Sequence, residues 1–314
     1  MTELSIIIPI YNEELNIQQL YSRLNPVIES ITENHELIFI NDGSKDKSIY
    51  LIKLLAANNP KIKYIDFSRN FGHQVAVSAG IDLCTGQAVA IIDADLQDPP
   101  ELIKEMYRKM EEGFDVVYAK RRSRKDKNVL KKIAYKVFYR LLARMSQVDI
   151  PLDTGDFRIM SRKIVDVLKN MPEQHKFLRG QIAWIGFNQT FVEYDRDIRA
   201  AGEPGYTYKK LFKLAFDGIT SFSNAPLRFA TISGVIVFFI SLILICYTLI
   251  SYFFFKGDIP QGWASIMISV LFIGGIQLLS IGIIGEYISR LQTDIKKRPL
   301  YIVNETNINS GNNS

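Results

Sequence analysis

A short apolar run ends in a cluster of carboxylates in the stretch AIIDADLQDPPE, residues 90–101. Asp93, Asp95 and Asp98 fall within six residues, where mutual repulsion is unfavourable unless positive charge lies beside them. Divalent cations such as Mg²⁺ bind carboxylate oxygens and keep positions for phosphate oxygens. Asp93 and Asp95 are therefore candidate metal ligands, and the amide oxygen of Gln97 is a third. A solvated loop that caps the next helix is the alternative that this motif alone leaves open.

Three further polar motifs each follow a strand-like apolar run. They are PIYNEE (9–14), NDGSKD (41–46) and SRNFGHQ (68–74). In open parallel sheets, ligands bind beyond the carboxyl ends of the strands, so these loops and the aspartates should meet at one edge. Together they indicate a pocket for a nucleoside diphosphate.

The elements that must position these motifs alternate between strand-like and helical patterns. Strands are expected at residues 4–10, 36–40, 62–67, 88–92 and 115–119. Helices are expected near residues 13–31, 46–58, 72–84 and 99–112. Such alternation predicts an α/β fold with a mostly parallel sheet that helices cover on both faces.

Two long apolar segments follow, at residues 227–255 and 263–285. Each exceeds the roughly 20 residues that span a bilayer, and core helices of soluble proteins seldom run so far without charge. The short linker between them predicts a two-helix transmembrane hairpin. Basic residues flank both outer ends of the hairpin, whereas the linker carries only Lys256. By the positive-inside rule, both termini and the preceding domain should be cytoplasmic.

Two other segments have the pattern of helices that lie in a membrane interface. Residues 129–145 carry basic side chains every four positions, at Lys132, Lys136, Arg140 and Arg144. An apolar stripe lies beside them, which is typical of an interfacial amphipathic helix. A helix packed on the sheet with a solvated basic face is the alternative. Residues 206–223 are a second candidate and lead into the first span.

Composition and segment boundaries give the expected organisation of the 314-residue chain, whose net charge is +5. The two cysteines, Cys84 and Cys246, imply no disulfide framework, which suits a reducing compartment. We expect a catalytic domain at 1–205, a juxtamembrane helix at 206–226, the hairpin at 227–288 and a cytoplasmic tail at 289–314. The polar end of the tail, NETNINSGNNS from Asn304, is expected to be disordered.

The motifs resemble those of family-2 glycosyltransferases that load sugars onto polyprenyl phosphate. The segments that carry the resemblance are IIPIYNEE, NDGSKDKS, SRNFGHQVAVSAG, DADLQDPPE, YAKRRSR, TGDFRIMSRK, the paired spans and RPLYIV. They cover about residues 1–303 in family order. The paired spans and the tail motif are most similar to bactoprenol glucosyltransferases, and dolichyl-phosphate mannosyltransferases are related. The resemblance implies a GT-A fold, a bound Mg²⁺ or Mn²⁺, and inversion at the anomeric carbon.

The resemblance also implies roles for residues on the nucleoside side of the site. Pro9, Tyr11 and Glu13 are similar to the shelf for the base and ribose. Asp42 is similar to the partner of uracil, whose N3–H a carboxylate can accept. Packing alone is the alternative for Tyr11, and capping of the following turn is the alternative for Asp42.

On the side of the chemistry, the resemblance implies the metal and diphosphate ligands Asp93, Asp95 and Gln97. Arg121 is similar to the arginine near the donor and acceptor phosphates, although a solvated basic run is the alternative. Asp156, in the GDF motif, is similar to the catalytic acid. Arg158 is a further candidate beside it, with a structural ion pair to Asp153 as the alternative. His73 is interpreted as structural.

The implied activity is inverting, metal-dependent transfer of a hexose from a UDP-sugar to undecaprenyl phosphate, with glucose favoured. It would take place at the cytoplasmic face of a bacterial inner membrane and supply cell-envelope glycan modification. N-acetylglucosamine, mannose, an aminoarabinose derivative and a GDP donor stay open, as does a non-catalytic lipid-carrier partner. A processive polysaccharide synthase is disfavoured because QIAWIGF (181–187) has no arginine before its tryptophan. No nucleic-acid partner is expected, and a homo-oligomer such as a tetramer is left open.

Overall fold

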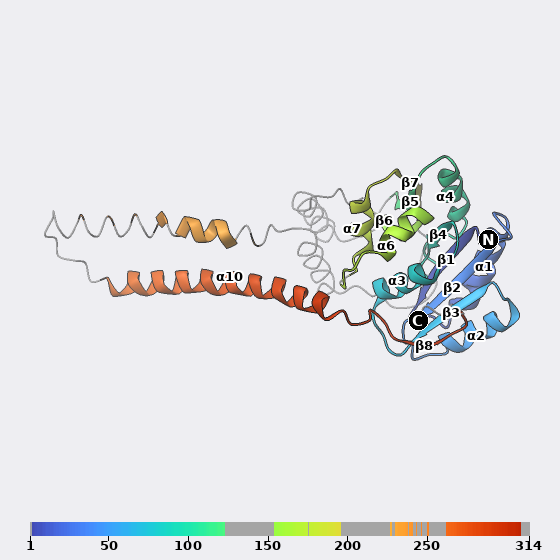
Figure 1. The fold of residues 1–314 in the computed structure, drawn as a ribbon, viewed down its shortest axis with the longest axis horizontal. Coiled ribbons are helices and arrows are strands. Elements are labelled where there is room, and N and C mark those ends of the chain that lie inside the picture. Colours follow the sequence, from blue (N-terminus) through green and yellow to red (C-terminus); the bar gives the residue numbers. More distant parts are fainter. Residues whose placement is uncertain are drawn as a thin grey trace.

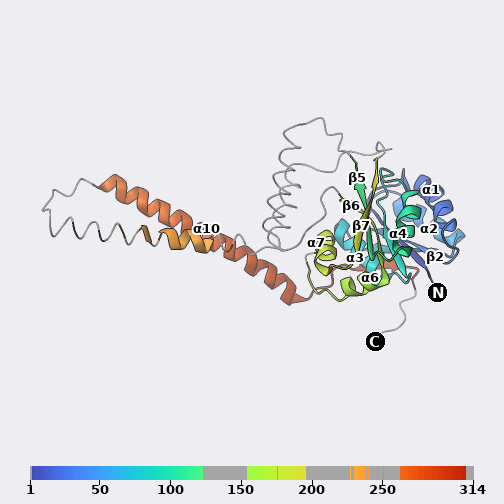
Figure 2. The same cartoon turned by 90° about the horizontal axis from the view of Figure 1, so that it is seen from above.

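The structure is a computed structural model that describes residues 2–122, 154–174, 176–195, part of 227–250, and 262–308. The predicted interfacial helices at 129–145 and 206–223 lie outside these residues. The described chain forms an α/β domain, from which apolar helical segments extend to one side (Figures 1 and 2).

The centre of the domain is a sheet whose described strands follow the order β7-β5-β6-β4-β1-β2-β3-β8 (Figure 1). The strands are β1 (Leu4–Ile10), β2 (His35–Asn41), β3 (Ile62–Phe67), β4 (Ala88–Ile91), β5 (Val116–Arg121), β6 (Thr154–Ser161), β7 (Gln189–Tyr194) and β8 (Val303–Thr306). β4, β1, β2 and β3 are mutually parallel, as predicted. β6 runs antiparallel between β4 and β5, so the described sheet is mixed.

Helices cover both faces of this sheet. They are α1 (Ile17–Glu29), α2 (Ser48–Asn58), α3 (His73–Leu83), α4 (Leu102–Glu111), α6 (Arg162–Lys169) and α7 (Leu178–Ile185), followed by the long helix α10 (Trp263–Lys296). Side chains of α1, α2 and α4 belong to one buried cluster, and those of α3, α6 and α7 belong to the other. The predicted doubly covered sheet is therefore confirmed.

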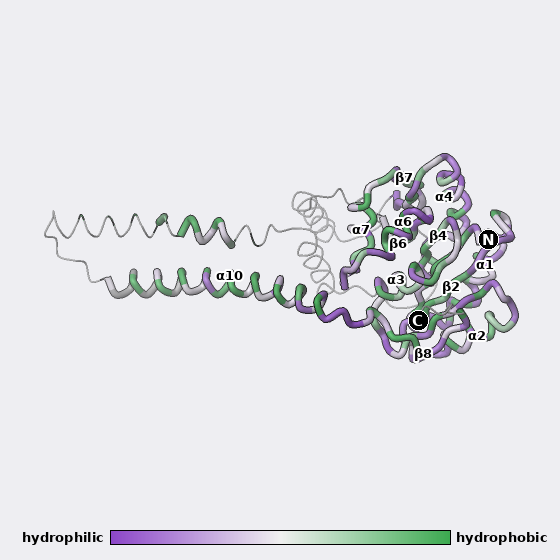
Figure 3. Tube along the Cα trace, in the orientation of Figure 1, coloured by the Kyte–Doolittle hydropathy of each residue, from purple (hydrophilic) through white to green (hydrophobic). Residues whose placement is uncertain are grey.

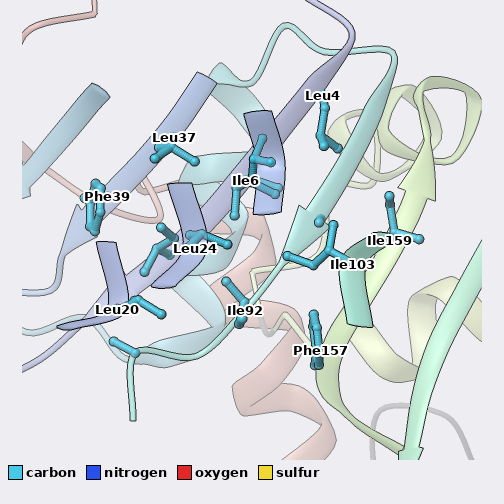
Figure 4. Close-up of a cluster of buried hydrophobic side chains, with 14 of the residues drawn as sticks. Leu4, Ile6, Leu20, Leu24, Leu37, Phe39, Ile92, Ile103, Phe157 and Ile159 are labelled. Atoms are coloured by element: carbon cyan, nitrogen blue, oxygen red, sulfur yellow. The ribbon is translucent and has the colours of Figure 1, made fainter. Parts of the chain in front are cut away.

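Strand β1, LSIIIPI, shows why its sequence reads as one continuous apolar run. All seven of its residues are buried. Ile6 and Ile8 point into the cluster that Figure 4 shows, together with Leu24 of α1 and Ile103 of α4. Ile7 points into the opposite cluster, under α3. Successive strand side chains alternate between faces, so a strand covered on both sides is apolar at most positions, and the buried Ser5 hydroxyl donates to Glu36.

The helix α10 extends away from the domain as a mostly apolar rod (Figure 3). Within the part of the chain that the structure describes, one helix is long and apolar enough to cross a membrane, with its window at Phe272–Lys296. None of that window is buried, and Leu278 is 73% exposed. The described positions in 227–250 are helical and run beside α10 in both views (Figures 1 and 2). Such exposed apolar surface is typical of contact with lipid or another apolar partner.

The tail after α10 returns to the domain, which corrects the predicted disorder from Asn304. Residues of β8 pair antiparallel with the edge of β3, with Thr306 opposite Ile65 and Glu305 opposite Asp66. The Tyr301 ring stacks on Phe67 with the ring centroids 5.0 Å apart. The prediction was wrong for the tail residues through 308 because composition alone ignores the unpaired backbone groups that an edge strand offers.

Candidate active site

The site lies at the carboxyl ends of the parallel strands, where Asp156 of β6 is surrounded by basic side chains. Arg179 of α7 makes a bidentate contact, with Nε 2.9 Å from Oδ1 and Nη2 3.0 Å from Oδ2. Arg158 Nη2 donates to Oδ1 at 3.1 Å, and His73 Nε2 lies 3.3 Å from Oδ2. Burial favours the neutral carboxyl, but Arg179 and His73 outweigh it and hold the pKa of Asp156 well below its usual range. Asp156 is therefore an anion fixed in orientation.

His73 bridges Asp156 to the aspartate motif after β4. Its Nε2 lies 3.6 Å from Asp93 Oδ1, although 41% of the imidazole side chain is exposed. Desolvation disfavours the imidazolium, but the carboxylates of Asp93 and Asp156 raise the pKa of His73 to about 9. His73, which was interpreted as structural with a position near the donor as the alternative, thus lies between two predicted site residues.

The aspartate motif presents oxygen atoms that suit a hard cation. Asp93 Oδ1 is buried and has no hydrogen-bond partner among the described residues. Burial, which is the largest cause, and the carboxylates of Asp156, Asp98 and Asp95 together raise the pKa of Asp93 to about 6, against the lowering effect of His73. Asp95 Oδ1 accepts the backbone N–H of Gln97 at 3.1 Å, which fixes the turn.

Within the described chain, no group of three or more His, Cys, Asp or Glu residues is arranged to hold a metal ion. Mg²⁺ commonly binds through only one or two protein carboxylates, with substrate phosphates and waters completing its octahedron. Asp93 and Asp95 fit that kind of open site, since Asp93 Oδ1 accepts no hydrogen bond from the described residues, although the His73 imidazole lies near it.

The third carboxylate of the motif has a different environment. Asp98 is buried, accepts a hydrogen bond from the Tyr194 hydroxyl, and lies 3.8 Å from Arg121 Nη2. Arg121 Nε in turn donates to the Tyr194 hydroxyl oxygen at 3.3 Å. A Cβ at Gly155 would lie 3.1 Å from Arg121 Nη2, so the glycine of the GDF motif gives the guanidinium room beside the catalytic strand. Asp98 thus anchors Arg121 next to the site.

A pocket of about 460 Å³ lies at the ends of β1, β2 and β3. Its lining includes Tyr11, Asn41, Asp66 and Arg69. The Tyr11 side chain is 46% exposed there, as a platform for a base would be. The volume is within the range of small-ligand pockets.

Asp42 does not line this pocket among the residues described. Its carboxylate accepts the backbone N–H of Phe71 at 2.7 Å and that of Gly72 at 3.0 Å. Pro9 is buried within β1, and Glu13 accepts from the Asn16 side chain at 2.5 Å. The contacts of these three residues with a donor therefore stay predictions.

Sequence reasoning missed two residues of this constellation, Arg179 and Asp66. Arg179 lies in HKFLRGQ, which matches no motif used above, and it reaches Asp156 only because α7 packs beside β6. Asp66 is the one acidic residue inside the apolar run of β3, IKYIDF, and that interruption is the signal that was available.

Parallel strands whose ends carry a nucleoside-sized pocket and paired aspartates define the class of GT-A glycosyltransferases. Two family profiles match the chain: "Glycosyl transferase family 2" at residues 5–168 and "GtrB C-terminal hairpin" at residues 225–291. The chain therefore belongs to glycosyltransferase family 2, and the predicted family, fold and enzyme class are confirmed.

Several relatives match nearly the whole chain. The uncharacterized glycosyltransferase YkcC of Bacillus subtilis is 48% identical over 96% of this chain and 93% of its own length. A prophage bactoprenol glucosyl transferase homolog of Escherichia coli is 40% identical over 96% of this chain and 98% of its own. Among solved structures, glucosyl-3-phosphoglycerate synthase from Mycobacterium tuberculosis, in complex with Mn²⁺, UDP and phosphoglyceric acid, matches with a TM-score of 0.48 and 17% identity. That match covers 70% of this chain and 76% of the other.

Proposed function

We propose that this protein transfers glucose from UDP-glucose to undecaprenyl phosphate, with inversion at the anomeric carbon, at the cytoplasmic face of a bacterial membrane. The observation that carries the proposal is Asp156, fixed by Arg179 and His73 beside the aspartate motif. The relatives named bactoprenol glucosyl transferase, 40% identical over nearly their full length, support the lipid acceptor. Another sugar, such as N-acetylglucosamine, mannose or an aminoarabinose derivative, is the alternative within the same reaction.

Asp93, Asp95 and Gln97 would hold a divalent cation, Mg²⁺ or Mn²⁺. When bound, the ion would neutralise the charge that grows on the leaving diphosphate. Arg121, held by Asp98 and Tyr194, would add a second positive charge beside the same phosphates. Tyr11 would carry the base and ribose at the pocket rim.

We assign Asp156 an orienting role in place of a general-base role. A phosphate monoester has a second pKa of about 6, so the acceptor is largely dianionic at neutral pH and needs little proton removal. The lowered pKa of Asp156 also makes it a weak base. The carboxylate therefore orients the acceptor and stabilises the positive charge that develops at the anomeric carbon.

Arg158 contributes by holding Asp156. Its side chain is 1% exposed, and its Nη2 donates to the Gly155 carbonyl at 2.9 Å as well as to Asp156 Oδ1. Such a buried guanidinium cannot reach a lipid phosphate without rearrangement, whereas Arg179 and Arg121 are 26% and 20% exposed. We therefore propose Arg179 and Arg121 as the phosphate-facing arginines.

The membrane segments would bring this pocket to the lipid acceptor. A hairpin with basic residues at both outer ends favours a cytoplasmic catalytic domain and cytoplasmic termini. A cysteine placed at Gly257 should then react with an impermeant thiol reagent in intact cells, whereas one placed at Asn312 should not. If the cysteine at Asn312 reacted and the one at Gly257 did not, the termini would lie outside the cell, and a cytoplasmic sugar donor could not be the substrate.

The direct test uses membranes that contain the protein, a panel of radiolabelled nucleotide sugars and undecaprenyl phosphate. We expect a lipid-linked product from UDP-glucose that disappears when EDTA removes divalent ions. A product from another sugar would correct the donor alone. No lipid product from any donor, with UDP binding intact, would overturn the proposed acceptor.

A further inference from the structure

The C-terminal strand β8 holds, through Asn304, a carboxylate that lines the pocket at the ends of β1, β2 and β3. Asn304 Nδ2 donates to Asp66 Oδ2 at 2.8 Å. Asn41 Nδ2, from the end of β2, donates to Asp66 Oδ1 at 2.6 Å. Asp66 is 8% exposed and lines the pocket beside Asn41. A residue that follows the long apolar helix in sequence thus holds a carboxylate at the site for the donor.

The two amides fix both the position of Asp66 and their own orientation. If the Asn41 amide were turned over, its Oδ1 would face the carboxylate oxygen, which repels it. As oriented, Asn41 Oδ1 is buried and has no hydrogen-bond partner among the described residues. The carboxylate of Asp66 and Oδ1 of Asn41 can therefore only accept further hydrogen bonds. A ligand that binds at this side of the pocket should donate a hydrogen to them.

We propose that Asp66 accepts the imino hydrogen of the donor base, and that Asn304 is the positioning residue that holds Asp66 for this contact. The inference rests on the proposed nucleoside-diphosphate sugar donor. Uracil offers an N3–H and guanine an N1–H, whereas cytosine N3 and adenine N1 are acceptors that an anionic carboxylate repels. The pair thereby selects against CDP and ADP donors.

Strand β8 is anchored independently of Asn304, so the role of Asn304 can be tested separately. Asn307 accepts from the Tyr64 backbone N–H at 2.7 Å and donates to the Ile62 carbonyl at 3.0 Å. Glu305 accepts from the Tyr64 hydroxyl at 2.7 Å, and Tyr301 stacks on Phe67. Removal of the Asn304 amide should therefore free Asp66 while the strand stays paired.

The experiment measures UDP affinity by calorimetry, with the full chain in detergent and no acceptor or sugar present. We expect Asn304→Ala to weaken UDP binding about 5- to 10-fold, the effect of one typical intramolecular hydrogen bond. The KM for the sugar donor should rise by the same factor, with kcat unchanged within about twofold. Asn307→Ala is the matched control: it removes an amide one residue beyond β8 that contacts Tyr64 and Ile62 and not Asp66, and UDP affinity should stay within about twofold. Equal losses in the two variants, or no loss in Asn304→Ala, would overturn the positioning role.

Base selection provides the second measurement. Asp66→Asn replaces an anionic acceptor with a group that can also donate, so the ratio of UDP to CDP affinity should fall at least about tenfold. If that ratio falls in Asp42→Asn and not in Asp66→Asn, Asp42 reads the base and our assignment is wrong. If the wild type binds GDP in place of UDP, the proposed donor fails, yet the same variants measured with GDP still decide the role of Asn304.

Discussion

Asp66 and Asp156 are both carboxylates at the ends of sheet strands, but they are held by opposite means. Asp66 accepts hydrogen bonds from two neutral amides, those of Asn41 and Asn304. Asp156 contacts the guanidinium groups of Arg179 and Arg158 and the imidazole ring of His73. Amides fix a carboxylate without cancelling its charge, which suits recognition of a neutral N–H. Cationic partners compensate the charge, so Asp156 can lie close to phosphates without strong repulsion.

The largest effect should follow from removing the compensated carboxylate. Asp156→Asn keeps the shape and leaves the basic groups around it without their counter-charge. We expect kcat to fall about 10³-fold or more, with UDP affinity nearly unchanged, because the loss lies in the transition state. The measurement is initial rate against pH. On the proposed orienting role, in which Asp156 is an anion and not a base, the rate of the variant should stay low and change little between about pH 7 and 9.

That profile also tests the orienting role. A true general base would be bypassed at high pH, where more of the acceptor is ionised. Recovery of the Asp156→Asn rate toward the wild-type rate over this range would show that proton removal is its function. Thermal unfolding of the variant serves as the control, because loss of the fold would also lower the rate.

A smaller but still large effect is expected at the aspartate motif. Asp95→Asn should lower transfer about 10²- to 10³-fold and shift the Mg²⁺ or Mn²⁺ concentration for half-maximal activity upward, since one anionic ligand is lost. Titration of each metal with UDP-sugar present checks this. If the variant kept wild-type activity in the presence of EDTA, the proposed metal would have no role in the transfer.

Arg179 tests whether charge alone is enough to hold Asp156. Arg179→Lys keeps the positive charge but cannot make the bidentate contact that Nε and Nη2 make now. We expect kcat to fall about 10- to 100-fold with KM for the donor little changed. Arg162→Lys is a suitable control, because Arg162 donates to backbone carbonyls of Gly86 and Cys84, away from Asp156. If both variants lose activity equally, the bidentate geometry has no special role.

The smallest effect should come from an exposed ion pair of β8, the strand that carries Asn304. Lys53 pairs with Glu305 of β8 at 2.5 Å, but the two side chains are 39% and 47% exposed. Exposed ion pairs contribute about 0–1 kcal/mol, so Lys53→Ala should change UDP affinity less than about twofold. Calorimetric measurement of the UDP affinity of Lys53→Ala beside that of Asn304→Ala checks this. A loss as large as that of Asn304→Ala would mean that the pocket depends on the strand as a whole.

The sequence predicts the parallel half of the sheet well because its signal is local. β1 and β3 begin and end at the predicted residues, since runs such as LSIIIPI are apolar at most positions when both faces are covered. β6 was not predicted, because TGDFRIMS carries the buried Arg158 and also Asp156, whose partners Arg179 and His73 come from elsewhere in the chain. β8 was missed because its residues are polar and its pairing is decided by the free edge of β3.

The site shows the same division. Motifs carry Asp93, Asp95 and Asp156, and the structure brings Asp93 and Asp156 to the same His73 imidazole, while their roles stay predictions. Arg179, His73 and Asp66 acquire their roles only through packing between distant segments, so spacing along the chain gave little indication of them. Polar residues that interrupt apolar elements, as Asp66 does in β3, are the signal to examine in similar sequences.

The return of the tail makes the hairpin region an insertion within one domain, with sheet strands on both sides of it in sequence. A soluble version of the catalytic domain made by stopping before the first apolar segment would lack β8. Its β3 would then be a bare edge strand, open to pairing with other molecules and prone to aggregation. A version in which a flexible linker replaces the hairpin and joins residues 301–308 to the domain should aggregate less, and it would suit calorimetry and crystallisation better.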